Sequence, residues 1–247
     1  MKALVVSVLA ALVLTGTAGA ASVQRGQRLY GQFCAACHLS ATPHTIGFGP
    51  GRELRQQKAL APSLHGVGAM AADFYLRTGY MPLRKTGLQP RRSRLVLSQG
   101  EISDLTAYVA SLGKGPAIPT PHPAQGNLSQ GMQLFADHCA GCHQIAAEGG
   151  YANGAVPPPL QDDSDVQIAE AVRIGPWVMP TFTQKAITNR QLDSIIRYVD
   201  YTKHPDDRGG WAIGRLGPIP EGLVTWLIAA VLLVCFCMAL GGRLRRE

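Results

Sequence analysis

Residues 33–38 read FCAACH, and residues 138–143 read HCAGCH. Each stretch carries two cysteines separated by two residues, and a histidine follows the second cysteine directly. Four such cysteines could form disulfides in an exported protein, or hold one zinc ion together. Neither arrangement needs a histidine after each pair. A proposal for the function of these cysteines therefore has to account for the histidine that follows each pair.

The sequence C-x-x-C-H is the attachment signature of c-type haem. The two thiols add to the vinyl groups of the haem, and the adjacent histidine becomes an axial ligand of the iron. Two copies in one chain predict two covalently bound haem c groups. The expected attachment residues are Cys34, Cys37, Cys139 and Cys142, and the expected axial histidines are His38 and His143.

The two motifs belong to a longer internal repeat. Segments of the two halves align in the same order: GQRLYGQFCAACH at 26–38 with GMQLFADHCAGCH at 131–143, APSL at 61–64 with PPPL at 157–160, RTGYMP at 77–82 with RIGPWVMP at 173–180, and EISDLTAYVASL at 101–112 with QLDSIIRYVDYT at 191–202. Each half therefore reads as a complete small domain.

The sequence of each half predicts a helix that leads into the attachment motif, then an irregular middle rich in glycine and proline, and then a closing amphipathic helix. The closing helices have apolar residues at helical spacing. These residues are Ile102, Leu105, Val109 and Leu112 in the first half, and Leu192, Ile195, Ile196 and Val199 in the second. We therefore expect an all-α fold, with domains so small that the haem supplies much of each core.

A sixth iron ligand is expected from the irregular middle of each half. Met81-Pro82 and Met179-Pro180 occupy equivalent places in the repeat, so Met81 and Met179 are the predicted ligands. The rival residues have no counterpart in the other half: Met70, His44, His65, His122 and His138. An iron with histidine and methionine ligands has no open position for a substrate, which predicts electron transfer and no catalytic residues.

Both ends of the chain carry membrane signals. Lys2, an apolar run and the small residues before Ala20 predict a secretory signal peptide at 1–20, with an uncleaved anchor as the alternative. Residues 222–242 contain no charge and are long enough to span a membrane once. The arginines that follow predict a cytoplasmic C-terminus, with both haem domains on the outer side of the cell membrane.

Charge differs between the halves. Residues 21–114 contain 12 Lys and Arg against 4 Asp and Glu, whereas residues 115–202 contain 4 against 8. The basic excess gathers at 77–94, which we expect to be a solvated face able to steer an acidic partner. An exported chain excludes nucleic acid as that partner. A proline-rich linker at 115–126 is expected to hold the domains apart.

The expected organisation follows from these features. It comprises a signal peptide (1–20), a first cytochrome c domain (21–114), the linker (115–126), a second cytochrome c domain (127–204), a juxtamembrane segment (205–221), a transmembrane helix (222–242) and a cytoplasmic tail (243–247).

The two attachment motifs, the two Met-Pro pairs and the segment GGWAIGRLGPIPEG at 209–222 resemble the dihaem cytochrome c subunit of the actinobacterial-type menaquinol–cytochrome c reductase, the cytochrome bcc complex. The resemblance covers essentially the whole chain and implies tandem class-I-like cytochrome c domains. It implies a cytochrome b subunit, a Rieske iron–sulfur subunit and an aa3-type oxidase as partners. It also implies electron flow from the Rieske centre to that oxidase, through a subunit that is not catalytic on its own.

One segment departs from the repeat, because the loop at 44–62 is longer than its counterpart in the second half. Two other functions share the haem motifs: a stand-alone membrane-anchored electron shuttle, and the cytochrome subunit of a periplasmic dehydrogenase. A haem enzyme such as a dihaem peroxidase would need one five-coordinate iron, which the paired methionines argue against.

Overall fold

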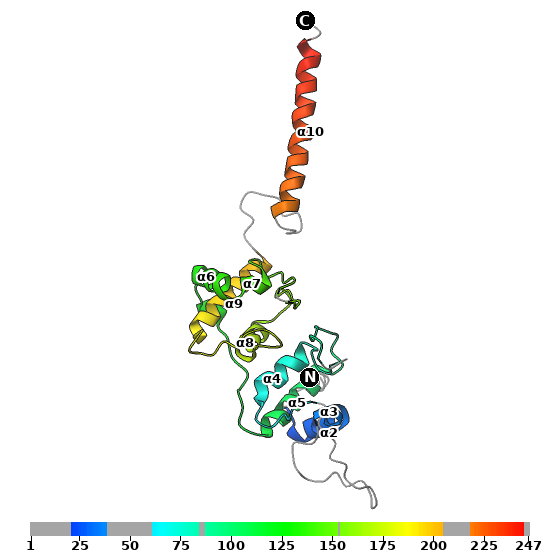
Figure 1. Ribbon diagram of the computed structural model, residues 1–247, viewed down its shortest axis with the longest axis vertical. Helices are drawn as coiled ribbons and strands as arrows, with labels where there is room; N and C mark the ends of the chain where they lie inside the picture. The colour runs from blue at the N-terminus through cyan, green and yellow to red at the C-terminus, as the bar shows by residue number, and fades with distance from the viewer. Residues whose placement is uncertain (1–20, 39–60, 84–86, 153, 205–217, 245–247) are drawn as a thin grey trace, which may run out of the picture. The chain divides into compact units, whose positions relative to one another are not determined.

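The computed structural model describes residues 21–38, 61–83, 87–152, 154–204 and 218–244. Within these ranges the chain is helical, with no strand and one isolated bridge between Ala152 and Ala155. This confirms the all-α prediction (Figure 1). The signal peptide at 1–20, most of the loop at 44–62 and most of the juxtamembrane segment lie outside the described residues.

The helices follow the repeat. The first repeat contains α2 (Val23–Phe33), α3 (Ala35–His38), α4 (Gly68–Arg77) and α5 (Gln99–Ser111). The second contains η1 (Pro123–Gln125), α6 (Leu128–His138), α7 (Ala140–His143), α8 (Asp165–Ile174) and α9 (Asn189–Lys203), and α10 (Pro218–Leu244) follows.

In each repeat the first helix crosses the last at a glycine. A methyl group on Gly26 of α2 would overlap the carbonyl of Asp104 on α5, and one on Gly131 of α6 would overlap the carbonyl of Ser194 on α9. One turn further along, an aromatic pair bridges the same helices, with ring centroids 5.2 Å apart for Tyr30 and Tyr108 and 5.3 Å apart for Phe135 and Tyr198. Glycine lets the two backbones approach closely enough for these rings to meet.

The apolar faces predicted for the closing helices are buried, except that Leu112, the residue after the end of α5, is only half-buried. On α5, Ile102 and Leu105 are each 1% exposed. The four predicted residues of α9 are all buried as well, with Ile196 and Val199 fully enclosed. Met70, a rival iron ligand, is instead a core residue in the first turn of α4.

Side-chain caps explain where several helices begin. Ser98 and Glu101 form a capping box at the start of α5, and Ser164 and Gln167 form another at the start of α8. In such a box the two side chains satisfy backbone N–H groups that have no partner within the helix. The caps fix where α5 and α8 begin, and α8 supplies side chains to the cavity described below.

The linker does not hold the two repeats apart, contrary to expectation. Both repeats belong to one compact unit that ends at Lys203, and α4 of the first repeat packs against α8 of the second. The linker itself is bound at both ends: the Met70 N–H donates to the Pro116 carbonyl at 3.1 Å, and the His122 N–H donates to Asp193 at 2.7 Å. Prolines keep the segment extended, and these bonds hold it along the repeats.

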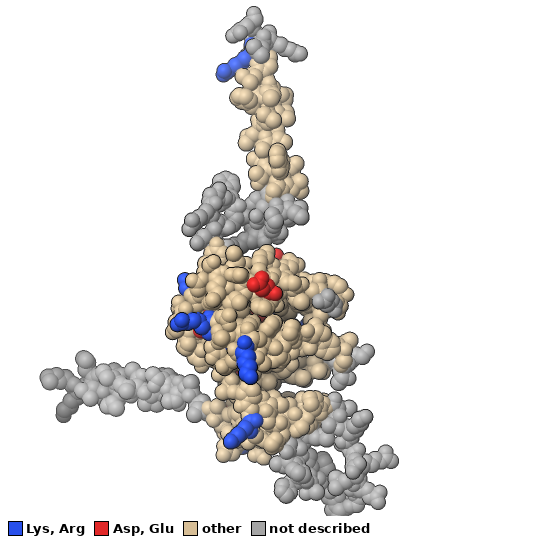
Figure 2. Space-filling view, turned by 60° about the vertical axis from the view of Figure 1, so that its left-hand side comes forward, with Lys and Arg blue, Asp and Glu red and all other residues tan. Residues whose placement is uncertain are grey.

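Helix α10 has the length and composition of a membrane span. Residues 222–243 form 22 residues of apolar helix, which at the rise of an α-helix measure about 33 Å, close to the thickness of a bilayer core. In Figure 2 the helix is an uncharged column with a basic residue at its C-terminal end. The predicted span is therefore present, and the helix extends beyond it in both directions.

Glu170 on α8 is a buried charge-bearing residue at the contact with α4. Its side chain is fully enclosed, and neither carboxylate oxygen has a hydrogen-bond partner within the described part of the chain. The pKa of Glu170 is raised to about 8, mainly by burial and to a smaller extent by nearby Asp73, while Arg77 acts in the opposite direction. Because a buried carboxylate without a partner is costly to ionise, Glu170 is mainly protonated at neutral pH.

The close helix crossing predicts that Gly26→Ala destabilises the protein. The added methyl meets the Asp104 carbonyl, and overpacking of this kind costs about 1–3 kcal/mol. Gly31 in the same helix has no atom within 4 Å of the corresponding position, so Gly31→Ala should stabilise it by about 0.5–1 kcal/mol. Thermal unfolding followed by circular dichroism compares the two. Equal effects of the two substitutions would contradict the proposed crossing.

Glu170 predicts a pH-dependent stability that Glu170→Gln removes. A raised pKa in the folded protein means that stability is fully present below the ordinary value of 4.5 and is lost as the pH rises through about 8. The melting temperature of E170Q relative to wild type should therefore rise across this window and then level off. Glu148 is exposed, and Glu148→Gln provides the matched control. A pH profile of E170Q parallel to that of wild type would rule out this role.

Candidate haem crevices

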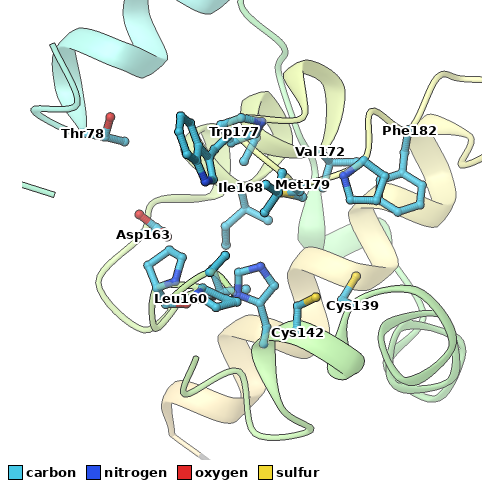
Figure 3. Close-up of a pocket in the computed structure, with 18 of the residues that line it drawn as sticks. Thr78, Cys139, Cys142, Leu160, Asp163, Ile168, Val172, Trp177, Met179 and Phe182 are labelled. Carbon is cyan, nitrogen blue, oxygen red and sulfur yellow. Dashed lines mark hydrogen bonds between the residues drawn. The ribbon is translucent and has the colours of Figure 1, made fainter. Parts of the chain in front are cut away.

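Both attachment motifs fold into the same turn. In the second repeat, α6 ends at His138, and the Cys139 N–H donates to the Phe135 carbonyl at 2.8 Å. The one-turn helix α7 then places Cys142 and His143 on the same side as Cys139, with the His143 N–H donating to the Cys139 carbonyl at 2.9 Å. Figure 3 shows the Cys139 and Cys142 sulfurs at the edge of one cavity.

The first repeat reproduces this geometry. The Cys34 N–H donates to the Tyr30 carbonyl at 2.9 Å, and the His38 N–H donates to the Cys34 carbonyl at 2.9 Å. The equivalent turn therefore presents Cys34, Cys37 and His38 together. All six cysteines of the chain lie in the described residues, and none of them is in a disulfide.

Each histidine is oriented by a proline carbonyl. The His143 Nδ1 lies 3.1 Å from the Pro158 carbonyl, and the His38 Nδ1 lies 2.7 Å from the Pro62 carbonyl. A carbonyl oxygen only accepts, so Nδ1 carries the proton and Nε2 remains free to bind a metal. Burial lowers the pKa of His143, which favours the neutral ring that a metal requires. The C-x-x-C-H motif does not indicate these carbonyls, although the alignment of APSL with PPPL pairs Pro62 with Pro158.

The cavity of the second repeat has the composition of a haem site. Cys139, Cys142 and His143 line one part of it, and Met179 lines another. The rest of the lining that the second repeat supplies is mainly apolar, including Phe135, Leu160, Ile168, Val172, Phe182 and Val199. A cavity with an apolar wall, two thiols and two potential axial ligands fits a covalently bound haem.

Burial also affects the first thiol of each attachment motif. It raises the pKa of Cys139 to about 12, with a smaller contribution from Cys142, and it raises the pKa of Cys34. Unmodified thiols at these two positions are therefore neutral at pH 7. Within the described residues no group of three or more His, Cys, Asp or Glu side chains gathers as a metal site.

Met179 reaches the cavity through a tight loop after α8. Gly175 ends the helix in the left-handed conformation (φ 65°), and the Phe182 N–H donates back to the Val172 carbonyl at 2.9 Å. Trp177 on this loop also has positive φ (58°), which is uncommon for a bulky residue. Figure 3 places Met179 beside Ile168 and Val172, facing the cavity.

Met81 holds the equivalent position after α4, half-buried, with its N–H donating to the Tyr75 carbonyl at 3.1 Å. Much of the middle of the first repeat lies at 39–60, outside the described residues. Of the remaining rival ligands, His65 and His122 are exposed, whereas His138 lines the second cavity with its ring 5.9 Å from that of Phe182. His44 lies outside the described residues.

The basic segment at 77–94 is only partly a free surface. Arg77 pairs with Asp73 at 2.8 Å in its own repeat, and Arg92 forms an ion pair with Asp163 of the second repeat. Arg91 and Arg94 are exposed, whereas Arg84 and Lys85 lie outside the described residues. Part of the charge expected to attract an outside partner therefore joins the two repeats.

Comparison with known proteins agrees with this arrangement. The family model described as "Cytochrome C oxidase, cbb3-type, subunit III" matches residues 21–109 and 126–199, one segment in each repeat. A "Cytochrome bc1 complex cytochrome c subunit" of Corynebacterium diphtheriae is 30% identical over 241 residues, covering 90% of this chain and 82% of the relative. The subunit of the same name from Mycobacterium tuberculosis is 30% identical, covering 90% and 79%.

A shorter similarity links the chain to a "Cbb3-type cytochrome c oxidase subunit FixP" of Sinorhizobium medicae, 32% identical over 152 residues, covering 57% of this chain and 45% of that one. The match over nearly the full length is thus to the bc1-type subunits. The chain belongs to the family of cytochrome c subunits of cytochrome bc1 complexes, and it is a membrane-anchored electron-transfer cytochrome with covalently bound haem c.

Proposed function

We propose that each repeat binds one haem c, so that the chain carries two. The attachment residues are Cys34 and Cys37 in the first repeat and Cys139 and Cys142 in the second; the axial ligands are His38 with Met81 and His143 with Met179. The observation that carries this proposal is the second cavity, where both cysteines, His143 and Met179 line one apolar space. The matching backbone turn at Cys34 extends the proposal to the first repeat.

A haem with these two ligands stores and releases one electron and leaves no position for a substrate. The protein's contribution is to hold His143 in one tautomer through Pro158, to place Met179 through the loop after α8, and to exclude water with apolar side chains. These are the tasks of an electron carrier and not of an enzyme acting on its own.

The chain occupies a defined place in respiration under this proposal. It accepts electrons from the Rieske iron–sulfur centre of a menaquinol-oxidising complex that also contains a cytochrome b subunit, and it delivers them to an aa3-type terminal oxidase. The similarity to bc1-complex subunits over 90% of the chain supports the assembly, and α10 supports anchoring beside membrane subunits. The arginine at the end of α10 supports a cytoplasmic C-terminus, with residues 21–221 on the outer side.

The haem assignment is tested on the full-length chain with Met179→Leu as the variant. A pyridine haemochrome assay gives the haem content, and a redox titration gives the reduction potentials. Wild type should contain two haems per chain. M179L should retain both, because attachment needs only the cysteines, but the reduction potential of one haem should fall when its methionine ligand is lost. Met132 on α6 is exposed, so Met132→Leu is the matched control. One haem per chain, or a potential unchanged in M179L, would contradict the assignment.

The assembly is tested by purification through a C-terminal tag in mild detergent, followed by identification of the subunits. Cytochrome b and Rieske subunits should accompany the chain, together with an aa3-type oxidase. A chain that carries two haems but purifies alone would contradict the assembly and support a stand-alone anchored shuttle. Recovery with a dehydrogenase subunit would identify the other alternative.

A further inference from the structure

The cavity of the second repeat is not closed by that repeat alone. Five residues of the first repeat also line it, and we call them the first-repeat wall: Phe74, Thr78, Tyr80, Gln89 and Pro90. Figure 3 shows Thr78 at the end of a separate helix, on the side of the cavity where Trp177 and Asp163 lie. The crevice that contains His143 and Met179 is thus completed by residues more than fifty positions earlier in the sequence.

The wall is a packed structure. The buried ring of Phe74 lies edge-on to Tyr80, with centroids 5.6 Å apart and planes at 85°, and Tyr75 packs against both rings. The Thr78 hydroxyl donates to the Phe74 carbonyl at 2.7 Å, and the Ser93 hydroxyl donates to the Gly79 carbonyl at 2.6 Å. Burial raises the pKa of Tyr80, so this phenol is neutral where it borders the cavity.

Two latches hold the wall against the second repeat. The Gln89 amide nitrogen donates to the Val156 carbonyl at 2.7 Å, and its amide oxygen accepts from the Val156 N–H at 2.8 Å. Arg92 forms an ion pair with Asp163 and donates to Gln167 at 3.3 Å. Gln89 and Asp163 both line the cavity, so each latch lies at its rim.

The ion pair between Arg92 and Asp163 joins a residue of the basic half to a residue of the acidic half. The first half is basic and the second acidic, and Arg92 with Asp163 brings the two signs into direct contact. The Asp163 side chain is 13% exposed and that of Arg92 is 38% exposed, so the pair is partly shielded from solvent. Opposite charges in such a place fix the register of a contact more than they strengthen it.

We propose that Gln89 and Arg92 are positioning residues for the haem of the second repeat: they hold the first-repeat wall over its crevice, exclude water and raise its reduction potential. This inference rests on the proposed function, because it takes the second cavity to be a haem site. A shielded haem favours the ferrous form, which carries less positive charge than the ferric form. Opening the wall should therefore lower the reduction potential of the haem in the second repeat.

Hydrogen–deuterium exchange of the full-length holoprotein in detergent tests the contact itself. The three prolines after Val156 have no N–H, so a peptide across residues 155–160 reports on very few amides. Gln89→Ala removes the acceptor of the Val156 N–H, and exchange at this amide should become up to roughly tenfold faster. Exchange unchanged in Q89A would overturn the proposal whatever the haem content.

A charge exchange tests the effect on the haem. Arg92→Asp and Asp163→Arg should each lower the potential of one haem in a redox titration, and the double variant R92D/D163R should restore it. Arg94 is exposed two residues further along, so Arg94→Asp applies the same change of charge away from the latch and should leave both potentials unchanged.

Two results would overturn the positioning role. Equal shifts of the reduction potential in R92D and R94D would show a general effect of charge. A potential that falls in the single variants and does not recover in R92D/D163R would show that the pairing of Arg92 with Asp163 is not the cause. Failure of the proposed function is separate and visible, because a second repeat without haem gives a single haem in the pyridine haemochrome assay while exchange at Val156 remains measurable.

Discussion

The close crossing of the first and last helices in each repeat is the constraint on which the rest of the molecule depends. At Gly26 and Gly131 the absence of a side chain lets two backbones nearly touch, and the aromatic pairs one turn away then meet. The attachment turn directly continues the first helix, so the same crossing decides where the cysteines and the histidine face. Apolar residues of the closing helix, such as Ile195 and Val199, also line the cavity.

Much of this arrangement can be predicted from residues that are close in sequence or repeated in it. Cys139, Cys142 and His143 lie within five positions, and the periodicity of Leu192 to Val199 predicts a helix whose apolar face is buried. Duplication adds information that one copy lacks, because Met81-Pro82 and Met179-Pro180 recur at equivalent places whereas Met70 has no counterpart. Met179 lines the cavity, whereas Met70 is part of the core.

Contacts between distant residues were not predictable in this way. The Pro158 carbonyl that orients His143 is a backbone atom, which a motif does not encode, and Glu170 looks like a surface position of a polar helix until α4 is packed against it. The sequence predicts that Arg92 belongs to a solvated basic face, because its partner, Asp163, is 71 residues away. The proline-rich linker was expected to separate the repeats, but its composition predicts stiffness and not the hydrogen bonds that hold it in place.

The first-repeat wall bears on how far the halves of this chain are modular. Tyr80, which lines the second cavity, directly precedes Met81, the proposed iron ligand of the first repeat, so under this proposal one loop serves two sites. A substitution in one half can therefore affect the site in the other half. The two repeats are under a shared constraint that two unlinked cytochromes would not have. A second repeat expressed alone would expose a surface that the intact chain covers, and it would be a poor stand-in for the same domain in its own protein. If both repeats bind haem as proposed, the duplication has produced one unit with two linked sites in place of two separate carriers.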